Sequence, residues 1–361
     1  MPPSTGDYTE GMSDSQSSPA APSWFRELKK FEVPSLPKAI WQLVNTVLPF
    51  ILCWGLMAWL LRTGVPYYFV LLAALPTSLF LVRVFIFFHD CTHGSFFKNP
   101  QANAVVGWIL GIFMFTAYRD WRRSHGIHHA TNANLDKRGV GDVWTLTLEE
   151  FRACSLGRKL WYRVYRNPVF MFFIVPPILF LFIHRLPSSS APLPEKASVW
   201  LTNLGVASMV LAMGFWGGWD ILLLVHLPVL YLTWIIGVWL FYVQHQFDPG
   251  YWAHKDEWSS FDAAMLGSSH YKLPKVLQWF SGNIGLHHIH HLRPRIPNYN
   301  LERCYRTIKE LQLPHPLTVL RSLKSMTLNL WDEKAKILIT FRQAMRAIRT
   351  SASALFLTPS A

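Results

Sequence analysis

Long apolar segments constrain this chain more than any other feature. A helix needs about 20 apolar residues to cross the hydrocarbon core of a bilayer, which is about 30 Å thick. Six segments reach or approach that length: Ala39–Leu61, Tyr67–Phe88, Ala104–Tyr118, Pro168–Ile183, Val199–Phe215 and Ile221–Val243. Because 51% of the 361 residues are hydrophobic and only 15% are charged, we expect an all-α integral membrane bundle rather than a soluble enzyme.

Charge is distributed unevenly along the chain, with 34 Lys and Arg against 21 Asp and Glu. Ten basic residues lie in Arg119–Arg166 and fifteen in Lys255–Arg349, whereas the connections near Arg62 and at Arg185–Lys196 carry one and two. The cations flank apolar segments and form no recognisable nucleic-acid-binding module, so we expect a membrane surface as partner and no nucleic acid. The positive-inside rule places the basic stretches and both termini in the cytoplasm and the two sparse connections outside.

The same pattern divides the chain into three regions. Residues 1–33 begin with a stretch rich in Ser, Pro and Gly and are predicted to form a disordered tail. Residues 34–330 are predicted to form a membrane domain with a cytosolic cap, in which prolines such as Pro294 and Pro297 break the chain into short helices. Residues 331–361 are expected to form an amphipathic helix and a tail, since their apolar residues recur at helical spacing.

Histidines are the most informative residues. Nine of the fifteen fall into three short groups at the edges of apolar segments, with the sequences HDCTH, HGIHH and HHIHH. Side chains at i, i+3 and i+4 share one face of a helix, so each group is predicted to present its rings together. The candidate metal ligands in these groups are His89, His93, His125, His128, His129, His287, His290 and His291. His288 points about 100° away from His287 and is expected to pack rather than bind. The alternative is that these are structural histidines at a membrane interface.

Ligand number and type narrow the choice of metal. Eight imidazoles are too many for one four-coordinate zinc ion, so two ions are implied. Neutral imidazole nitrogen suits iron, zinc, copper and nickel, and redox-active iron is the best single fit, with copper and zinc left open.

A shared metal centre restricts the topology, because all three groups must lie on one side of the membrane. The number of crossings between them must therefore be even, and Ala104–Tyr118, which alone separates His93 from His125, is predicted to be interfacial or re-entrant. Three apolar segments lie between His129 and His245, and an even number of crossings allows only two of them to span fully. Pro168–Ile183 or Val199–Phe215 is therefore expected to be partly interfacial. The sequence thus predicts about four spanning helices plus interfacial helices.

Four stretches together resemble the membrane fatty acid desaturase family, in particular its bacterial Δ12 or omega-6 branch. They are FFHDCTHGSFF (Phe87–Phe97), RRSHGIHHATNAN (Arg122–Asn134), FYVQHQF (Phe241–Phe247) and GNIGLHHIHHLRPRIPNYNL (Gly282–Leu301). The resemblance implies a di-iron centre held by the three histidine groups, with His245 as a ninth ligand. It also implies a bacterial inner-membrane location and insertion of a cis double bond into a long acyl chain, more readily an acyl-lipid than an acyl-CoA or acyl-carrier protein.

An unactivated methylene offers neither an acidic proton nor a carbonyl, so an oxidant is required and no catalytic side chain separate from the metal site is expected. O2 would be the co-substrate, and the electrons must come from an external carrier such as a ferredoxin, because the sequence shows no cysteine-ligated cluster or dinucleotide fingerprint. Asp90 and Asn283 are expected to orient ligand rings, with solvated or helix-capping roles as the alternative. An alkyl, sterol or carotenoid hydroxylase and a non-enzymatic metal transporter or sensor are the alternative functions.

Overall fold

Four long helices dominate the computed structural model, which describes residues 22–313 and 315–356, with side chains to residue 350. The helices that are long and apolar enough to cross a membrane are Leu36–Arg62, Tyr67–Thr92, Leu193–Gly217 and Trp219–His245. The first two are single helices, α1 (Leu36–Arg62) and α2 (Tyr67–Thr92). The third consists of α8 (Leu193–Ala212) and the π-helical turn η4 (Met213–Gly217). The fourth consists of α9 (Trp219–Ile221), η5 (Leu222–His226) and α10 (Leu227–His245). The predicted helical membrane bundle is confirmed.

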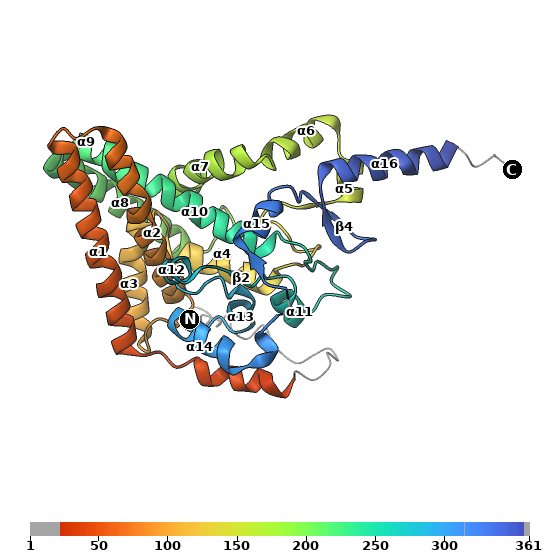
Figure 1. Ribbon diagram of the computed structural model, residues 1–361, viewed down its shortest axis with the longest axis horizontal. Helices are drawn as coiled ribbons and strands as arrows, with labels where there is room; N and C mark the ends of the chain where they lie inside the picture. Colours follow the sequence, from red (N-terminus) through yellow and green to blue (C-terminus); the bar gives the residue numbers. More distant parts are fainter. Residues whose placement is uncertain (1–21, 314, 357–361) are drawn as a thin grey trace.

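Two of these helices form an antiparallel pair at one edge of the molecule (Figure 1). α1 ends at Arg62, the chain turns through Gly64 at φ 74°, and α2 begins after Pro66, whose fixed φ suits a helix start. Large apolar side chains along α1 are exposed, including Trp41, Leu52 and Trp59. An apolar helix face of this kind is stable only against lipid.

The segment predicted not to cross the membrane is divided by a sharp bend. α3 (Pro100–Phe113) and α4 (Tyr118–Thr131) meet at 98°. Asn99 caps α3 by accepting hydrogen bonds from the next two free backbone amides, and Phe115 in the elbow has φ 56°. The apolar helix therefore begins earlier than the predicted Ala104 and ends at Phe113, and the elbow turns α4 along the face that carries the histidines.

A second bent pair distinguishes the two segments between which the sequence left the choice open. α6 (Leu156–Tyr165) and the broken run η2 (Phe170–Ile174), α7 (Val175–Leu181) and η3 (Ile183–Arg185) meet at 65°. Val199–Phe215, in contrast, lies inside a candidate span. The backbone amide of Arg119, at the start of α4, donates to Ser198 Oγ at 3.1 Å, so α8 begins on the histidine side. The predicted outer placement of Arg185–Lys196 stays a prediction, and this contact with the histidine-bearing α4 argues against it.

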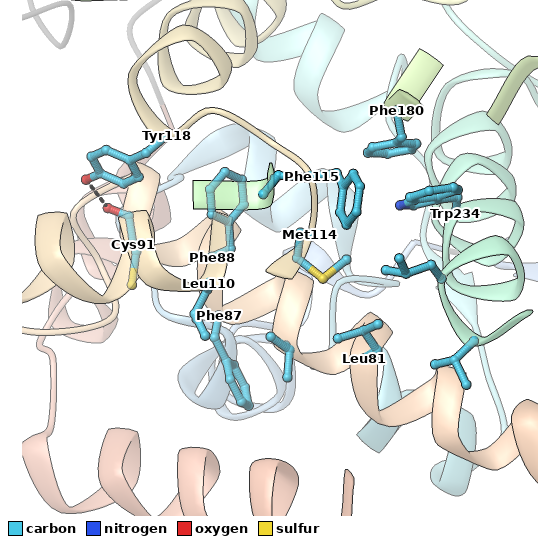
Figure 2. Close-up of a cluster of buried hydrophobic side chains, with 14 of the residues drawn as sticks. Leu81, Phe87, Phe88, Cys91, Leu110, Met114, Phe115, Tyr118, Phe180 and Trp234 are labelled. Carbon is cyan, nitrogen blue, oxygen red and sulfur yellow. Dashed lines mark hydrogen bonds between the residues drawn. The ribbon is translucent and has the colours of Figure 1, made fainter. Parts of the chain in front are cut away.

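A buried apolar cluster joins the elbow to the spanning helices (Figure 2). The Phe180 ring of α7 stacks on Trp234 of α10 with centroids 5.2 Å apart, and Phe115 packs edge-on against the same indole at 5.6 Å. The Tyr118 hydroxyl donates to the Cys91 carbonyl at 3.0 Å and fixes α4 to the end of α2. This cluster positions two histidine-bearing helices relative to each other.

The cap consists of short helices and two very small sheets. The helices are α5 (Leu148–Ala153), α11 (Ser260–Met265), α12 (Lys275–Phe280), α13 (His287–Leu292), α14 (Asn298–Thr307), η6 (Lys309–Leu311) and α15 (Val319–Ser325). One sheet has the order β1 (Leu146–Thr147), β4 (Leu330–Asp332) and β5 (Ile337–Ile339), and the other pairs β2 (Tyr271–Lys272) with β3 (Leu317–Thr318). β1 and β4 are parallel, β4 and β5 antiparallel, and β2 and β3 parallel.

The C-terminal prediction of one amphipathic helix from residue 331 is wrong in its first part. β4 and β5 form a hairpin in which Trp331 pairs with Leu338, and Trp331 is only 2% exposed. The helix α16 (Phe341–Phe356) begins after this hairpin. Burial of the Trp331 ring in the cap outweighs the helical spacing of these apolar residues, and the predicted tail at residues 357–361 lies outside the described residues.

The N-terminal prediction of disorder is also wrong where the structure describes the chain. Ser23–Phe31 forms the 3-10 helix η1, whose Leu28 and Phe31 side chains are buried against the cap. Asn300 Nδ2 donates to the Phe31 carbonyl at 3.0 Å, and Arg293 pairs with Glu32 at 2.6 Å. Residues 1–21 of the predicted tail lie outside the described residues.

Candidate metal centre

Nine histidine rings from four helices converge in two adjacent groups. Rings from the end of α2, from α4, from the end of α10 and from α13 take part. The first group contains His89, His93, His125, His129 and His290, and the second contains His128, His245, His287 and His291. Within each group, one nitrogen of every ring lies within 4.8 Å of those of the other rings. All nine residues singled out in the sequence are therefore brought together.

Each H-x-x-H-H motif contributes to both groups. In α4, His125 and His129 belong to the first group and His128 to the second. In α13 the assignment is reversed, because His287 and His291 belong to the second group and His290 to the first. Residues at i and i+4 thus share a group while the remaining ring points into the neighbouring one. The spacing predicted a common face but could not predict this division.

The approach of ring nitrogens shows that the two groups suit cations. His245 Nε2 lies 3.0 Å from His128 Nε2 and 3.0 Å from His287 Nε2. His245 Nδ1 faces the Gly267 carbonyl at 3.4 Å and is therefore the nitrogen that carries the hydrogen. Because a neutral imidazole has only one N–H, His245 Nε2 carries a lone pair. The same pattern recurs in the first group, where His129 Nε2 lies 3.0 Å from His125 Nε2 and from His290 Nε2. Lone pairs that face one another at this distance are stabilised by a cation between them.

Burial keeps the rings in the form that binds metals. Burial, followed by the charges of neighbouring imidazoles, holds the pKa of His129, His287 and His290 well below the usual value. These three rings are therefore neutral near pH 7, with a nitrogen lone pair available to an ion.

Two carboxylates orient rings from outside the groups. Asp142 Oδ1 lies 2.7 Å from His128 Nδ1, and both side chains are buried. Asp90 Oδ1 lies 3.3 Å from His89 Nδ1, while its Oδ2 accepts hydrogen bonds from the backbone amide and side chain of Asn298 at 2.7 and 2.8 Å. Such contacts fix the tautomer of a ligand ring and raise its basicity. Asp90 thus has the orienting contact that the sequence suggested.

Asn283 has a different role from the one expected. Its side chain bonds to Gln278 Nε2 at 2.9 Å and to the Asn298 carbonyl at 3.0 Å, so it connects parts of the cap rather than orienting a ligand.

Sequence reasoning missed Asp142, because it lies 14 residues after His128 in a glycine-containing loop without a spacing signal. It also missed Trp121, whose ring stacks on His125 at 4.2 Å and 22°. Trp121 precedes His125 by four residues, so helical spacing was a usable signal.

The remaining histidines lie outside both groups, as expected. His288 Nε2 lies 2.9 Å from the Leu311 carbonyl, and the ring packs against His270 at 5.6 Å. His254 binds Asp136 and Glu333 on the surface of the cap. Two others, His184 and His226, lie among the membrane helices, and His315 is exposed in the cap.

Comparison with known proteins places this arrangement in a family. The family model for fatty acid desaturases matches residues 64–322, which include all nine rings. A fatty acid desaturase of Bacillus subtilis is 43% identical over 317 residues, covering 88% of this chain and 90% of its own length. An sn-1 oleoyl-lipid 12-desaturase of a Synechocystis species is 25% identical and covers 68% of this chain and 70% of its own length.

A third relative is an sn-1 acyl-lipid omega-3 desaturase (ferredoxin) of a Nostoc species, which is 29% identical over 63% of both chains. The family match covers most of the chain, and the histidine motifs that suggested it are the residues that converge in the structure. The chain belongs to the fatty acid desaturase family and is a membrane-bound oxidoreductase.

Proposed function

We propose that this desaturase inserts a cis double bond, of the Δ12 or omega-6 type, into the acyl chain of a membrane lipid. The observation that carries the proposal is the convergence of nine histidine rings into one group of five and one group of four. The Synechocystis relative named as an oleoyl-lipid 12-desaturase supports the position of the bond and the lipid-bound substrate.

Iron is the metal that best suits the two groups. Five nitrogen donors in the first group exceed the four that a structural zinc site uses. Two nitrogens that are each about 2.1 Å from one ion lie about 3.0 Å apart when the bonds meet at a right angle and about 3.4 Å apart at the tetrahedral angle. The observed separation of 3.0 Å between His245 Nε2 and His128 Nε2 supports an ion with more than four ligands.

The reaction consumes O2, two electrons and two protons, removes two hydrogens from adjacent methylenes and releases two waters. Two irons held by His89, His93, His125, His129 and His290 and by His128, His245, His287 and His291 would supply the oxidising chemistry. The protein's own residues orient the rings through Asp142 and Asp90. Trp121, which stacks on His125, and the buried ring of Phe88 form an apolar wall beside the first group. Such a wall excludes water and favours an acyl chain over a polar substrate.

Product analysis in cells tests the proposal. We expect that expression in a host that lacks dienoic fatty acids yields a new dienoic acid, located by gas chromatography and mass spectrometry. His128→Ala should abolish this product, while His254→Ala, which removes an exposed histidine outside both groups, should retain it. A product that gains an oxygen instead of losing two hydrogens would favour the hydroxylase alternative.

The electron donor is proposed to be an acidic carrier such as a ferredoxin that docks on the cytosolic cap. Arg295 and Lys309 are exposed on the cap near α13 and α14, and charge complementarity of this kind accelerates association. Replacing both with glutamine should slow electron transfer from a reduced ferredoxin at low salt and have less effect at high salt. An unchanged rate of electron transfer at low salt would mean that these cations do not bind the donor and are present only because basic residues favour the cytoplasmic side of the membrane.

A further inference from the structure

A groove of about 480 Å³ lies outside the metal centre, between α6, the turn after α15 and the start of α16. Its residues come from three parts of the chain, and none of the nine clustered histidines lines it. Figure 1 shows α6 and α16 at the same edge of the molecule, with α6 leading through α7 towards the spanning helices. The groove therefore lies where the cap borders the membrane domain.

Three arginines give the groove a strong positive charge. Arg163 and Arg342 are exposed at its rim, and Arg166, which is only 2% exposed, also lines it. No acidic residue lines the groove, and within the described part of the chain the ion pairs involve other cations. The three charges are thus not neutralised by carboxylates.

The buried arginine is the decisive member of the set. Arg166 Nη2 donates to Leu328 O at 2.6 Å, to Gln246 Oε1 at 2.9 Å and to the Tyr242 hydroxyl at 3.3 Å, all of which are uncharged acceptors. Its Nε is buried and has no hydrogen-bond partner in the described structure. A buried guanidinium without a counter-charge is costly, so an anion in the groove would stabilise it.

Apolar surface adjoins these charges. Pro168, Met326 and Met345 line the groove, and the Arg163 guanidinium carbon lies 5.3 Å from the Phe341 ring centroid. The neighbouring segment from α6 to η2 exposes large apolar side chains, namely Leu160, Trp161, Val164, Val169 and Phe173. A basic helix with an exposed apolar face is typical of a segment that lies in the membrane interface.

We infer that this groove binds an anionic phospholipid of the leaflet next to the cap. The lipid phosphate lies among Arg163, Arg166 and Arg342, and its glyceryl and acyl portions cover the apolar floor and the exposed face of α6. Arginine suits this role because its planar donors match phosphate oxygens. The site is separate from the metal centre, so it does not depend on the proposed double-bond position.

Lipid binding to the purified full-length protein in micelles tests this inference, with native mass spectrometry and thermal stability as readouts. Phosphatidylglycerol should remain bound and raise the Tm, whereas phosphatidylcholine and millimolar inorganic phosphate should have little effect. Arg163→Gln combined with Arg342→Gln should weaken phosphatidylglycerol binding about 10- to 30-fold, since each basic residue near a membrane surface contributes a roughly fivefold factor. Arg342→Gln alone should have an intermediate effect.

The matched control is Arg321→Gln combined with Lys324→Gln, which removes two exposed charges from the nearby α15 outside the groove. This control should bind phosphatidylglycerol as the wild type does. Equal weakening in the control would indicate general surface attraction and overturn the inference. Unchanged binding in the groove variant, or a Tm increase of the same size with phosphatidylcholine or inorganic phosphate, would overturn it as well.

Discussion

At the scale of single residues, Asp142 is the group whose role is most open to a direct test. Its carboxylate lies 2.7 Å from His128 Nδ1 in a buried setting. Asp142→Asn keeps the shape but removes the charge that makes the ring a better ligand. We expect iron affinity to fall about 10- to 100-fold, as is usual when such an orienting partner is lost. Iron retained during titration with a chelator measures this directly.

Asp136→Asn is a closely matched control for that experiment. Asp136 also places a carboxylate oxygen 2.7 Å from a histidine Nδ1, but that histidine is the exposed His254 outside both groups. The control should retain iron as the wild type does. If Asp142→Asn and Asp136→Asn behave alike, the orienting role of Asp142 is wrong.

Residue-level prediction from the sequence succeeded where the chemistry follows from local spacing. The i, i+3 and i+4 pattern was sufficient to identify eight of the clustered rings, and family resemblance supplied His245. The division of His125 and His128 between two groups could not be predicted, because it depends on how α4 and α13 cross. Asp142 could not be predicted either, because its contact with His128 depends on how the loop after α4 folds and not on a helical spacing.

At the scale of elements, the elbow between α3 and α4 determines where the second histidine motif lies. A Cβ added at Gly111 would lie 2.5 Å from the Thr116 carbonyl oxygen and 3.1 Å from the Phe88 ring. Gly111→Ala is therefore expected to destabilise the fold by about 1–3 kcal/mol through overpacking. The thermal midpoint in micelles should fall by several degrees.

Gly55→Ala in α1 provides the comparison, because a Cβ there would meet nothing within 4 Å. Alanine is also the better helix former, so this variant should keep or slightly raise the thermal midpoint. Equal stability of the Gly111 and Gly55 variants would show that the elbow tolerates the extra methyl group and is looser than described.

A surface cluster connects the loop after α4 to the β4–β5 hairpin and should respond to pH. His254 lies 2.7 Å from Asp136 and 2.9 Å from Glu333, and Lys255 donates its backbone N–H to Asp136. Hydrogen bonds to Glu333 and Asp136 raise the pKa of His254 above its ordinary value. The stabilising contribution is fully present below the unfolded pKa of about 6.5 and is lost as the pH rises through the raised folded value.

The thermal midpoint of the wild type should therefore fall slightly more than that of His254→Gln as the pH is raised from below 6.5. Because the cluster is exposed, the difference should be only about 1–2 °C. His315→Gln, which removes an exposed histidine outside the cluster, should follow the wild type. Identical profiles for the wild type and His254→Gln would contradict the contribution of this cluster.

Element-level prediction was accurate where long apolar runs meet a lipid environment and failed where short segments fold against the cap. The helix predicted from residue 331 is replaced by the β4–β5 hairpin in its first part, because burial of Trp331 in the cap favours strands there. Likewise, η1 forms because Leu28 and Phe31 gain a buried surface, which composition alone does not reveal.

At the scale of the whole molecule, the arrangement of spans makes a clear topological prediction. Four crossings place Ser188 on the side of the histidines and Gly217 on the opposite side. With Cys53 and Cys154 replaced by serine, a membrane-impermeant maleimide should label Gly217→Cys in intact cells. Ser188→Cys should react only after the membrane is opened. Reaction of Ser188→Cys in intact cells would mean that the bent segment from α6 to η3 crosses the membrane.

The whole-molecule architecture was largely predictable because one requirement, histidines on a common side, fixes the parity of the crossings. The structure added which segment is broken, and it did so through the 65° bend after α6 and the contact of Ser198 with Arg119. Sequence hydropathy could not make that choice correctly, since the broken segment Pro168–Ile183 contains no polar residue, whereas Val199–Phe215 contains Thr202, Asn203 and Ser208.

The iron content of the purified full-length protein tests the central claim most directly. The two groups predict two irons per chain by elemental analysis. His128→Ala and His290→Ala, which each remove a ring from a different group, should each lower the content to about one. A wild-type protein loaded anaerobically with iron that still contains none, or two irons retained in both variants, would contradict a pair of histidine-bound metals.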